Sequence, residues 1–327
     1  MTLVLREEDV RGLLTMEDCI SWLEESFKAY AAGQARNLPR ARVRHPNGIL
    51  HVLPAADLSA GAIGLKTYTS GRGGTRFLVI LSSSTTGELL ALLEADYLGQ
   101  VRTGAASGLA TRLMAHPDAK RVGIYGTGSQ ARTQLAAVAA VRKLESATAW
   151  SRDAAHRERF CAEASQQLGI PVRPASSPEE AARGQDVVIT ITTARYPVLR
   201  GEWLEAGTHV NAAGSNSLLR REIDDEAVQR ADRIVIDSRT QGRLECGDLF
   251  GPAERGLIDW DQLVELHEVV AEPSRGRGSP QEITLFESLG LGLEDVTVAM
   301  RVYQRARERG LGQEVELFAG VRPREGR

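Results

Sequence analysis

The sequence has little of what marks several large classes of protein. Three cysteines in 327 residues are too few for a disulfide framework, so a reducing, cytoplasmic setting is expected. The 40 Lys and Arg nearly balance the 43 Asp and Glu, which argues against a nucleic-acid binder and a polybasic membrane anchor. No run of about 18 apolar residues occurs, and Arg6 interrupts the first apolar stretch. We therefore expect neither a membrane span nor a signal peptide.

Patterns typical of metal or nucleophile chemistry are also missing. The six histidines show no metal-binding spacing. The acids at 224–226 are explained by the first turn of a helix, where carboxylates meet the positive end of the dipole. No G-x-S-x-G motif and no P-loop lysine occur. We expect no metal site and no covalent nucleophile.

The first third of the chain predicts a helix followed by an antiparallel sheet. Ile20, Leu23, Phe27 and Tyr30 share one face of a helix over 15–32. Turn signals separate four short apolar segments, at 48–54, 61–69, 77–82 and 89–94. A further helix is expected over 97–114. This pattern predicts an α+β domain.

From residue 121 onward, strands alternate with helices. Strands are expected at 121–128, where the apolar run ends in glycines, and at 147–150, 186–191, 208–214 and 233–237, with helices at 129–143, 153–168 and 292–310. This alternation is typical of α/β proteins with a doubly wound parallel sheet, the Rossmann arrangement. The tail at 321–327 is expected to fray.

A glycine-rich turn joins the first of these strands to its helix. Gly126, Gly128 and Ala131 fit the pattern G-x-G-x-x-A at a strand-to-helix junction. Gly126 permits the tight turn, and Gly128 lets the backbone approach a pyrophosphate. The helix N-terminus offers free N–H groups to that phosphate. The motif predicts a dinucleotide site, with a ligand-free glycine turn as the alternative.

The end of the next strand bears on which dinucleotide binds. An NAD site usually has an acid there for the ribose 2′-hydroxyl, but this chain has Ser151, Arg152 and Asp153. Ser151 does not repel a 2′-phosphate, and Arg152 can hold one through two hydrogen bonds. We expect NADP(H). NAD(H) is the alternative if Asp153 takes the acidic role and Arg152 is only a solvated loop residue.

Nearly the whole chain resembles the ornithine cyclodeaminase/mu-crystallin family through blocks in matching order and spacing. The blocks are Pro39–Arg42, Gly64–Lys66, Gln100–Ala105, Gly126–Ala131, Val210–Gly214, Arg221–Asp224, Glu245–Asp248, Ser288–Gly290 and Glu294–Asp295. The resemblance implies a homodimer whose subunits act on small amino acids or their imines. It implies a substrate-binding and dimerisation domain at 1–115, a NAD(P)-binding Rossmann domain at 116–300, and a C-terminal helix and tail at 301–327 that return to the first domain.

The resemblance also implies the site. Arg42, Lys66 and Arg102 match basic side chains around the substrate carboxylate, and three cations from separate segments can converge on one anion. Taken singly, each also fits a solvated or strand position. Asn216 and Leu289 are implied on the substrate side. The implied cofactor residues are Arg102, Thr103, Gly126, Gly128, Ser129, Gln130, Ser151, Arg152, Thr192, Val210, Asn211, Ala212, Ala213, Arg220 and Ser288.

One position departs from the cyclodeaminases. They have an aspartate two residues after the position of Gly214, where this chain has Asn216. An ionised aspartate can take a proton from a substrate amine, and asparagine cannot. Mu-crystallin-like ketimine reductases also lack this acid. We therefore expect NAD(P)H-dependent reduction of small cyclic imino acids, Δ1-pyrroline-2-carboxylate or Δ1-piperideine-2-carboxylate, to proline or pipecolate. Lys66 or water would supply a proton, and Asn216 would orient the ring nitrogen.

Three alternatives stay open. One is ornithine or lysine cyclodeamination with bound NAD, and another is an alanine-type or opine-type amino-acid dehydrogenase. The third is a non-catalytic NADPH-binding protein. The expected partners are a small amino-acid-derived substrate and a second copy of the chain, with no nucleic acid and no membrane.

Overall fold

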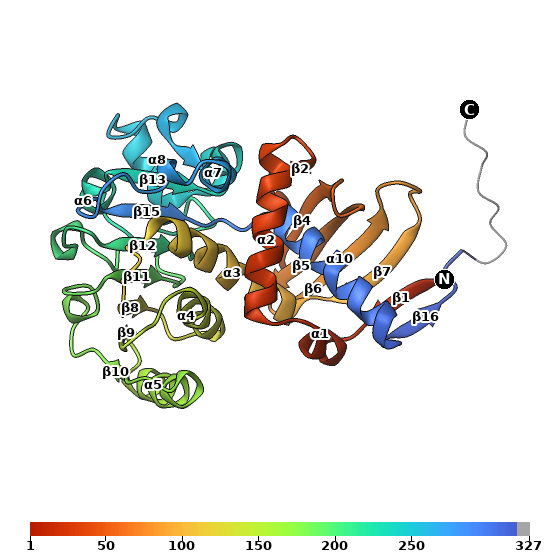
Figure 1. Ribbon diagram of the computed structural model, residues 1–327, viewed down its shortest axis with the longest axis horizontal. Coiled ribbons are helices and arrows are strands. Elements are labelled where there is room, and N and C mark those ends of the chain that lie inside the picture. The colour runs from red at the N-terminus through yellow and green to blue at the C-terminus, as the bar shows by residue number, and fades with distance from the viewer. Residues whose placement is uncertain (319–327) are drawn as a thin grey trace.

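Two sheets lie side by side in the computed structural model, which describes residues 1–318 (Figure 1). Helices α2 (Met16–Ala31) and α3 (Asp96–Met114) run between them. The tail predicted to fray, 321–327, lies outside the described residues. None of the helices within residues 1–318 is both long and apolar enough to cross a membrane.

The first sheet is mostly antiparallel. Its strands are β1 (Thr2–Leu5), β2 (Ala35–Asn37), β3 (Ala41–His45), β4 (Gly48–Asp57), β5 (Ala62–Gly71), β6 (Gly74–Ser83), β7 (Leu89–Glu94) and β16 (Gln313–Val315). They follow the order β16-β1-β7-β6-β5-β4-β2, and β3 also pairs with β4. The four segments expected as strands are confirmed as β4 to β7. The sequence did not predict β1, which pairs parallel to β7 and antiparallel to β16.

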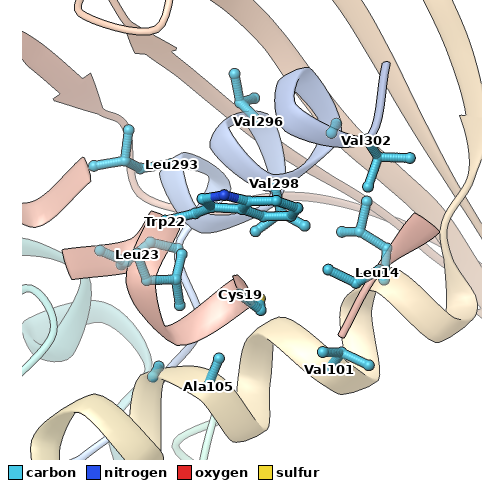
Figure 2. Packing of buried hydrophobic residues seen from close by; sticks show 14 of the residues in the cluster. Leu14, Cys19, Trp22, Leu23, Val101, Ala105, Leu293, Val296, Val298 and Val302 are labelled. Atoms are coloured by element: carbon cyan, nitrogen blue, oxygen red, sulfur yellow. The ribbon is translucent and has the colours of Figure 1, made fainter. Parts of the chain in front are cut away.

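Helices α1 (Glu7–Leu13), α2, α3 and α10 (Gly292–Arg309) build the core of the first lobe. Thr15 accepts a hydrogen bond from the Asp18 N–H, which caps α2. Cys19, Leu23 and Phe27 recur every four residues, so they lie on one buried face. Figure 2 shows α2 side chains between the valines of α10 and the side chains of α3.

Helix α10 returns the chain to the first lobe. It begins at Gly292, so the expected domain boundary at residue 300 falls inside the helix. A Cβ at Gly292 would lie 2.5 Å from the Leu53 carbonyl oxygen, so the residue lets α10 approach β4 closely. The whole helix packs on the first sheet and its helices.

The second sheet is parallel throughout its described pairs. Its strands are β8 (Arg121–Tyr125), β9 (Ser146–Trp150), β10 (Val172–Pro174), β11 (Val187–Thr190), β12 (His209–Ala212), β13 (Arg233–Ile236), β14 (Val264–Glu265) and β15 (Thr284–Glu287). The helices of this lobe are α4 (Ser129–Val141), α5 (Ala154–Leu168), α6 (Asp225–Arg230), α7 (Arg239–Glu245), α8 (Gly247–Glu254) and α9 (Leu266–Ala271).

The strand order β10-β9-β8-β11-β12-β15-β13-β14 confirms the Rossmann sheet and the expected fold class. The direction in which strands are added reverses between β8 and β11. Ligands of such sheets bind at this reversal, outside the carboxyl ends of the strands.

Candidate active site

A cavity of about 1130 Å³ lies where the two lobes meet. On one side it reaches the turns that follow β8, β9, β11 and β12, at the carboxyl ends of the parallel strands. On the other side it is walled by β3 to β6 and α3. The cavity therefore joins the expected dinucleotide turn to the expected substrate residues.

The wall from the first sheet follows from strand periodicity. Alternate side chains of a strand face the same side, and those that line the cavity are Arg40, Arg42, Arg44, Ile49, His51, Leu53, Lys66, Tyr68, Ser70, Thr75 and Phe77. The strand register sets Arg42, His51, Tyr68 and Phe77 side by side in one row across the sheet. Arg42 is thus a direct cross-strand neighbour of His51.

Lys66 and Arg102 form a buried basic cluster with two carboxylates at the start of α10. Lys66 Nζ donates to Asp295 Oδ1 at 3.0 Å, and Arg102 Nε donates to the same oxygen at 2.9 Å. Arg102 Nη1 also donates to Glu294 Oε2 at 2.7 Å. Burial, with the neighbouring charge of Arg102, lowers the pKa of Lys66 to about 8, although Asp295 opposes the shift. The lysine is therefore cationic at neutral pH and can release its proton at a modest cost.

Arg42 bridges the lobes at the same end of the cavity. Its Nη1 lies 2.5 Å from Glu245 Oε2, and its Nη2 donates to the Asn216 carbonyl oxygen at 2.8 Å. Arg40 Nη1 lies 3.5 Å from the other Glu245 oxygen. Arg40 Nη2 donates to the Leu289 carbonyl oxygen at 2.7 Å.

The charges of these two clusters do not cancel. Arg40, Arg42, Lys66 and Arg102 carry the positive charges, and the carboxylates paired with them among residues 1–318 are Glu245, Glu294 and Asp295. Each cation has a carboxylate partner, but the four cations share three carboxylates, so this mostly buried site carries one net positive charge. Such a charge is costly unless an anion joins it.

His51 lies beside this basic end and is held as a neutral ring. It stacks on Tyr68 with ring centroids 4.3 Å apart, and its Nε2 lies 3.1 Å from Ser70 Oγ. Burial lowers the pKa of His51 to about 4, and the charges of Arg42, Arg40, Arg44 and Arg220 act in the same direction. The ring therefore supplies a hydrogen-bonding group and no charge at neutral pH.

The glycine turn after β8 has the geometry that its motif predicts. Gly126 has a φ of 104°, and a Cβ there would lie 2.3 Å from the Ile191 carbonyl oxygen, so only glycine fits. Helix α4 starts at Ser129 with no side-chain cap from Gly128. Its first N–H groups therefore remain available to an anion. Gly126, Gly128, Ser129 and Gln130 all line the cavity.

At the end of β9, the Asp153 side chain is used as a helix cap. Asp153 caps α5 by accepting the His156 N–H at 2.9 Å, and it does not line the cavity. Ser151 and Arg152 do line it. Arg152 has no ion-pair partner within residues 1–318.

The structure brings most of the other predicted residues to the cavity. Those lining it are Thr103, Thr192, Ala213, Asn216, Arg220, Ser288 and Leu289. Val210, Asn211 and Ala212 do not line it, because they lie inside β12 and are buried. Asn211 donates to Thr111 Oγ1 at 2.8 Å in the packing against α3. The contact of these three residues with the cofactor stays a prediction.

Sequence reasoning missed the acids that organise the site. Glu245, Glu294 and Asp295 were noted only as parts of matching blocks, yet they hold the basic side chains in place. The placement of Glu294 and Asp295 in an otherwise apolar stretch, GLGLEDVTVAM, is a signal that could have found them. Within residues 1–318, no group of three His, Cys, Asp or Glu side chains is arranged to hold a metal.

Comparisons with known proteins agree with this geometry. Residues 1–310 match the sequence model of the Ornithine cyclodeaminase/mu-crystallin family. A Δ1-pyrroline-2-carboxylate reductase of Bacillus cereus is 33% identical, over 96% of this chain and 100% of the relative. The Thermococcus litoralis Δ1-pyrroline-2-carboxylate reductase, solved with NADH and L-proline, is 35% identical with a TM-score of 0.92, over 96% of this chain and 100% of that one. An archaeal alanine dehydrogenase dimer with bound NAD is 33% identical with a TM-score of 0.91, over 97% of this chain and 99% of that one.

Proposed function

Because the chain belongs to the ornithine cyclodeaminase/mu-crystallin family, we propose that it is an NAD(P)H-dependent oxidoreductase that reduces small cyclic imino acids. The substrates are Δ1-pyrroline-2-carboxylate and Δ1-piperideine-2-carboxylate, and the products are proline and pipecolate. Two relatives of similar length reduce the first of these imines, by their names.

One observation carries the proposal. The side chains of Arg40, Arg42, Lys66 and Arg102, which together carry one more charge than their paired carboxylates, line the same cavity as the dinucleotide turn at Gly126. A substrate carboxylate would neutralise that charge and fix the orientation of the molecule that bears it. The imine carbon next to this carboxylate would then lie on the cofactor side of the cavity.

The residues at the turn fit a dinucleotide. Gly126 leaves no room for a side chain, and the uncapped start of α4 supplies N–H groups for a pyrophosphate. When bound, the reduced cofactor supplies the hydride that adds to the C=N carbon.

Lys66, Arg102 and Arg42 hold the carboxylate, and Asn216 orients the imine nitrogen. Arg220 Nη1 donates to Asn216 Oδ1 at 3.3 Å, which leaves the Asn216 Nδ2–H group to donate to that nitrogen. The nitrogen must gain a proton as the carbon gains hydride. Lys66 can supply it, because its lowered pKa, about 8, makes the ammonium group a better acid than an exposed lysine.

We propose NADP(H) as the preferred cofactor, with NAD(H) also accepted. Arg152 reaches the cavity without an acid partner among the described residues, and Asp153 is held as a helix cap. A 2′-phosphate would meet a guanidinium there and no carboxylate. Because the related structures hold NADH or NAD, NAD(H) is tested as well.

We also propose a homodimer. The related alanine dehydrogenase is a dimer, and Leu38 and Val43, at the exposed edge of the first sheet, are 59% and 62% exposed. Light scattering of the purified chain tests this assignment, and a monomer would refute it.

The function is tested by a cofactor-oxidation assay with Δ1-pyrroline-2-carboxylate and either NADPH or NADH. We expect loss of the reduced cofactor's absorbance and formation of L-proline, with Lys66→Met as the inactive control. Ammonia release from ornithine with NAD, together with no oxidation of NADPH or NADH by the imine, would reverse the assignment in favour of a cyclodeaminase.

A further inference from the structure

Glu222 is a fully buried acid that does not line the cavity but joins the two loops that do. Its Oε1 accepts the Thr192 N–H at 2.5 Å, just past the end of β11. Its Oε2 accepts the Gly214 N–H at 2.7 Å, just past the end of β12. One carboxylate therefore ties together the carboxyl ends of two neighbouring parallel strands.

These two loops form a wall of the dinucleotide slot. Thr192 and Gly214 both line the cavity, and Thr192 also abuts the dinucleotide turn, with its Cγ2 3.2 Å from where a Gly126 Cβ would stand. The two loops pack tightly against each other. A Cβ at Gly214 would lie 2.4 Å from the Thr192 carbonyl oxygen and 2.6 Å from Glu222 Oε1. The position of the carboxylate therefore sets how far apart the loops stand.

The Glu222 carboxylate is surrounded by hydrogen-bond donors, and other acidic side chains lie close to it. Thr190 Oγ1 adds a third donor to the carboxylate, at 2.9 Å from Oε2. Asp248 on α8 holds the backbone by accepting the Glu222 and Ile223 N–H groups at 2.6 and 3.0 Å. The other charged groups that face this cluster are Glu287 of β15, which acts on Glu222, and Arg221, which acts on Asp248. Three donors to one carboxyl group favour its ionised form, in which both oxygens accept and neither donates.

We propose that Glu222 is a positioning residue for the dinucleotide: its ionised carboxylate holds the Thr192 and Gly214 loops at the separation that cofactor binding requires. This inference rests on the dinucleotide binding proposed above and adds to it a residue outside the cavity.

The proposal carries a pH dependence. Burial, reinforced by the charge of Asp248, raises the pKa of Glu222 to about 7. Protonation makes the carboxyl group neutral, and a neutral group accepts the Thr192 and Gly214 N–H groups more weakly than a carboxylate, so both loops are held less firmly. Affinity for the cofactor is therefore expected to fall as the pH decreases through about 7.

The test compares Glu222→Gln with the wild type by NADH fluorescence titration. The amide sets an NH₂ group against a backbone N–H, and leaving a buried donor unsatisfied predicts a dissociation constant about tenfold higher. The KM for NADH should rise likewise, with kcat at saturating NADH almost unchanged. The matched control is Asp224→Asn, the same change two residues along the segment. Asp224 accepts the Gly201 and Ala227 N–H groups and touches neither loop, so wild-type affinity is expected.

The pH series separates positioning from a general structural role. NADH is used because it lacks the 2′-phosphate, which itself titrates near pH 6. The wild type and Asp224→Asn should lose affinity from about pH 8 to about pH 6, and Glu222→Gln should lose much less. His156, which contacts Thr127 near the turn, is present in every protein compared, so it does not distinguish them.

Thr190→Val keeps the test decisive if Glu222→Gln does not fold. Loss of the hydroxyl donor destabilises the ionised carboxylate, so the midpoint of the pH dependence should move upward. The inference is overturned if Glu222→Gln binds NADH like the wild type, or if the midpoint is the same in Thr190→Val. If the wild type itself fails to bind NADH and NADPH, the proposed function fails instead.

Discussion

Lys66 and Arg102 share one acceptor, because both donate to Oδ1 of Asp295, at 3.0 and 2.9 Å. The shared oxygen brings two cations from different segments, β5 and α3, to one point in the wall of the cavity. Their charges repel each other, and Asp295 together with Glu294, which accepts from Arg102, offsets that repulsion. A substrate carboxylate would offset the one positive charge left over where Arg40 and Arg42 share Glu245.

Replacing Lys66 with methionine should remove most of the imine reductase activity. The substitution keeps the volume and removes one charged hydrogen bond to the carboxylate together with the proposed proton source. Loss of such a contact in a buried site predicts a fall in kcat/KM of at least about a hundredfold. Steady-state kinetics with Δ1-pyrroline-2-carboxylate measure it. Because Lys66 lies at the substrate end, the NADPH dissociation constant should stay within about twofold; a large rise would contradict this placement.

The activity should fall as the pH rises through about 8. Lys66 is cationic below its pKa and neutral above it, and that pKa is lowered to about 8 by burial. The carboxylate then loses a positive partner and the imine nitrogen loses its proton source. In Asp295→Asn, the group that favours the charged lysine is gone, so this decline should begin at lower pH. Profiles of kcat/KM against pH for the two proteins check the direction; a decline at higher pH in the variant would be inconsistent.

Arg152→Gln should reduce the preference for NADPH over NADH. Arg152 is the cationic side chain at the end of β9. Its loss should weaken the binding of NADPH by about tenfold or more and leave the binding of NADH nearly unchanged. The ratio of kcat/KM for the two cofactors measures the effect. Arg173→Gln is the control, since Arg173 is exposed on the neighbouring strand β10 and does not line the cavity. Equal losses for both cofactors would point to a structural role for Arg152.

The parts of the site that sequence reasoning predicted are those set by local structure or by matching blocks. The turn at Gly126 depends only on a strand, three small residues and a helix start, so its pattern is readable from the sequence alone. The basic residues Arg42, Lys66 and Arg102 followed from the resemblance. Asp153 could not be assigned in advance, because whether it faces a ribose or caps α5 depends on the turn geometry.

The parts that were missed depend on long-range pairing. Asp295 stands 229 residues after Lys66 and 193 after Arg102, so no spacing rule relates them. The helix at 292–310 and its return to the first domain were predicted, but the boundary was placed at residue 300, because the close packing of Gly292 against β4 is not visible in a single sequence. The position of His51 depends on the same kind of pairing: the register of β4 and β5 places it on the face of the sheet that carries Lys66, and it lines the cavity.

Asn216→Asp should lower imine reduction without creating a cyclodeaminase. The Asn216 carbonyl oxygen already accepts from Arg42 and its side chain accepts from Arg220, so a carboxylate at this position would pair with both guanidiniums. It would compete with the substrate carboxylate for Arg42, and KM for the imine should rise by about tenfold. Ammonia release from ornithine with NAD should stay at background, because the cationic end is arranged for a substrate whose nitrogen is already part of a C=N bond. An aspartate variant that releases ammonia from ornithine faster than the wild type reduces the imine would show that Asn216 had replaced the proton-accepting group of a cyclodeaminase.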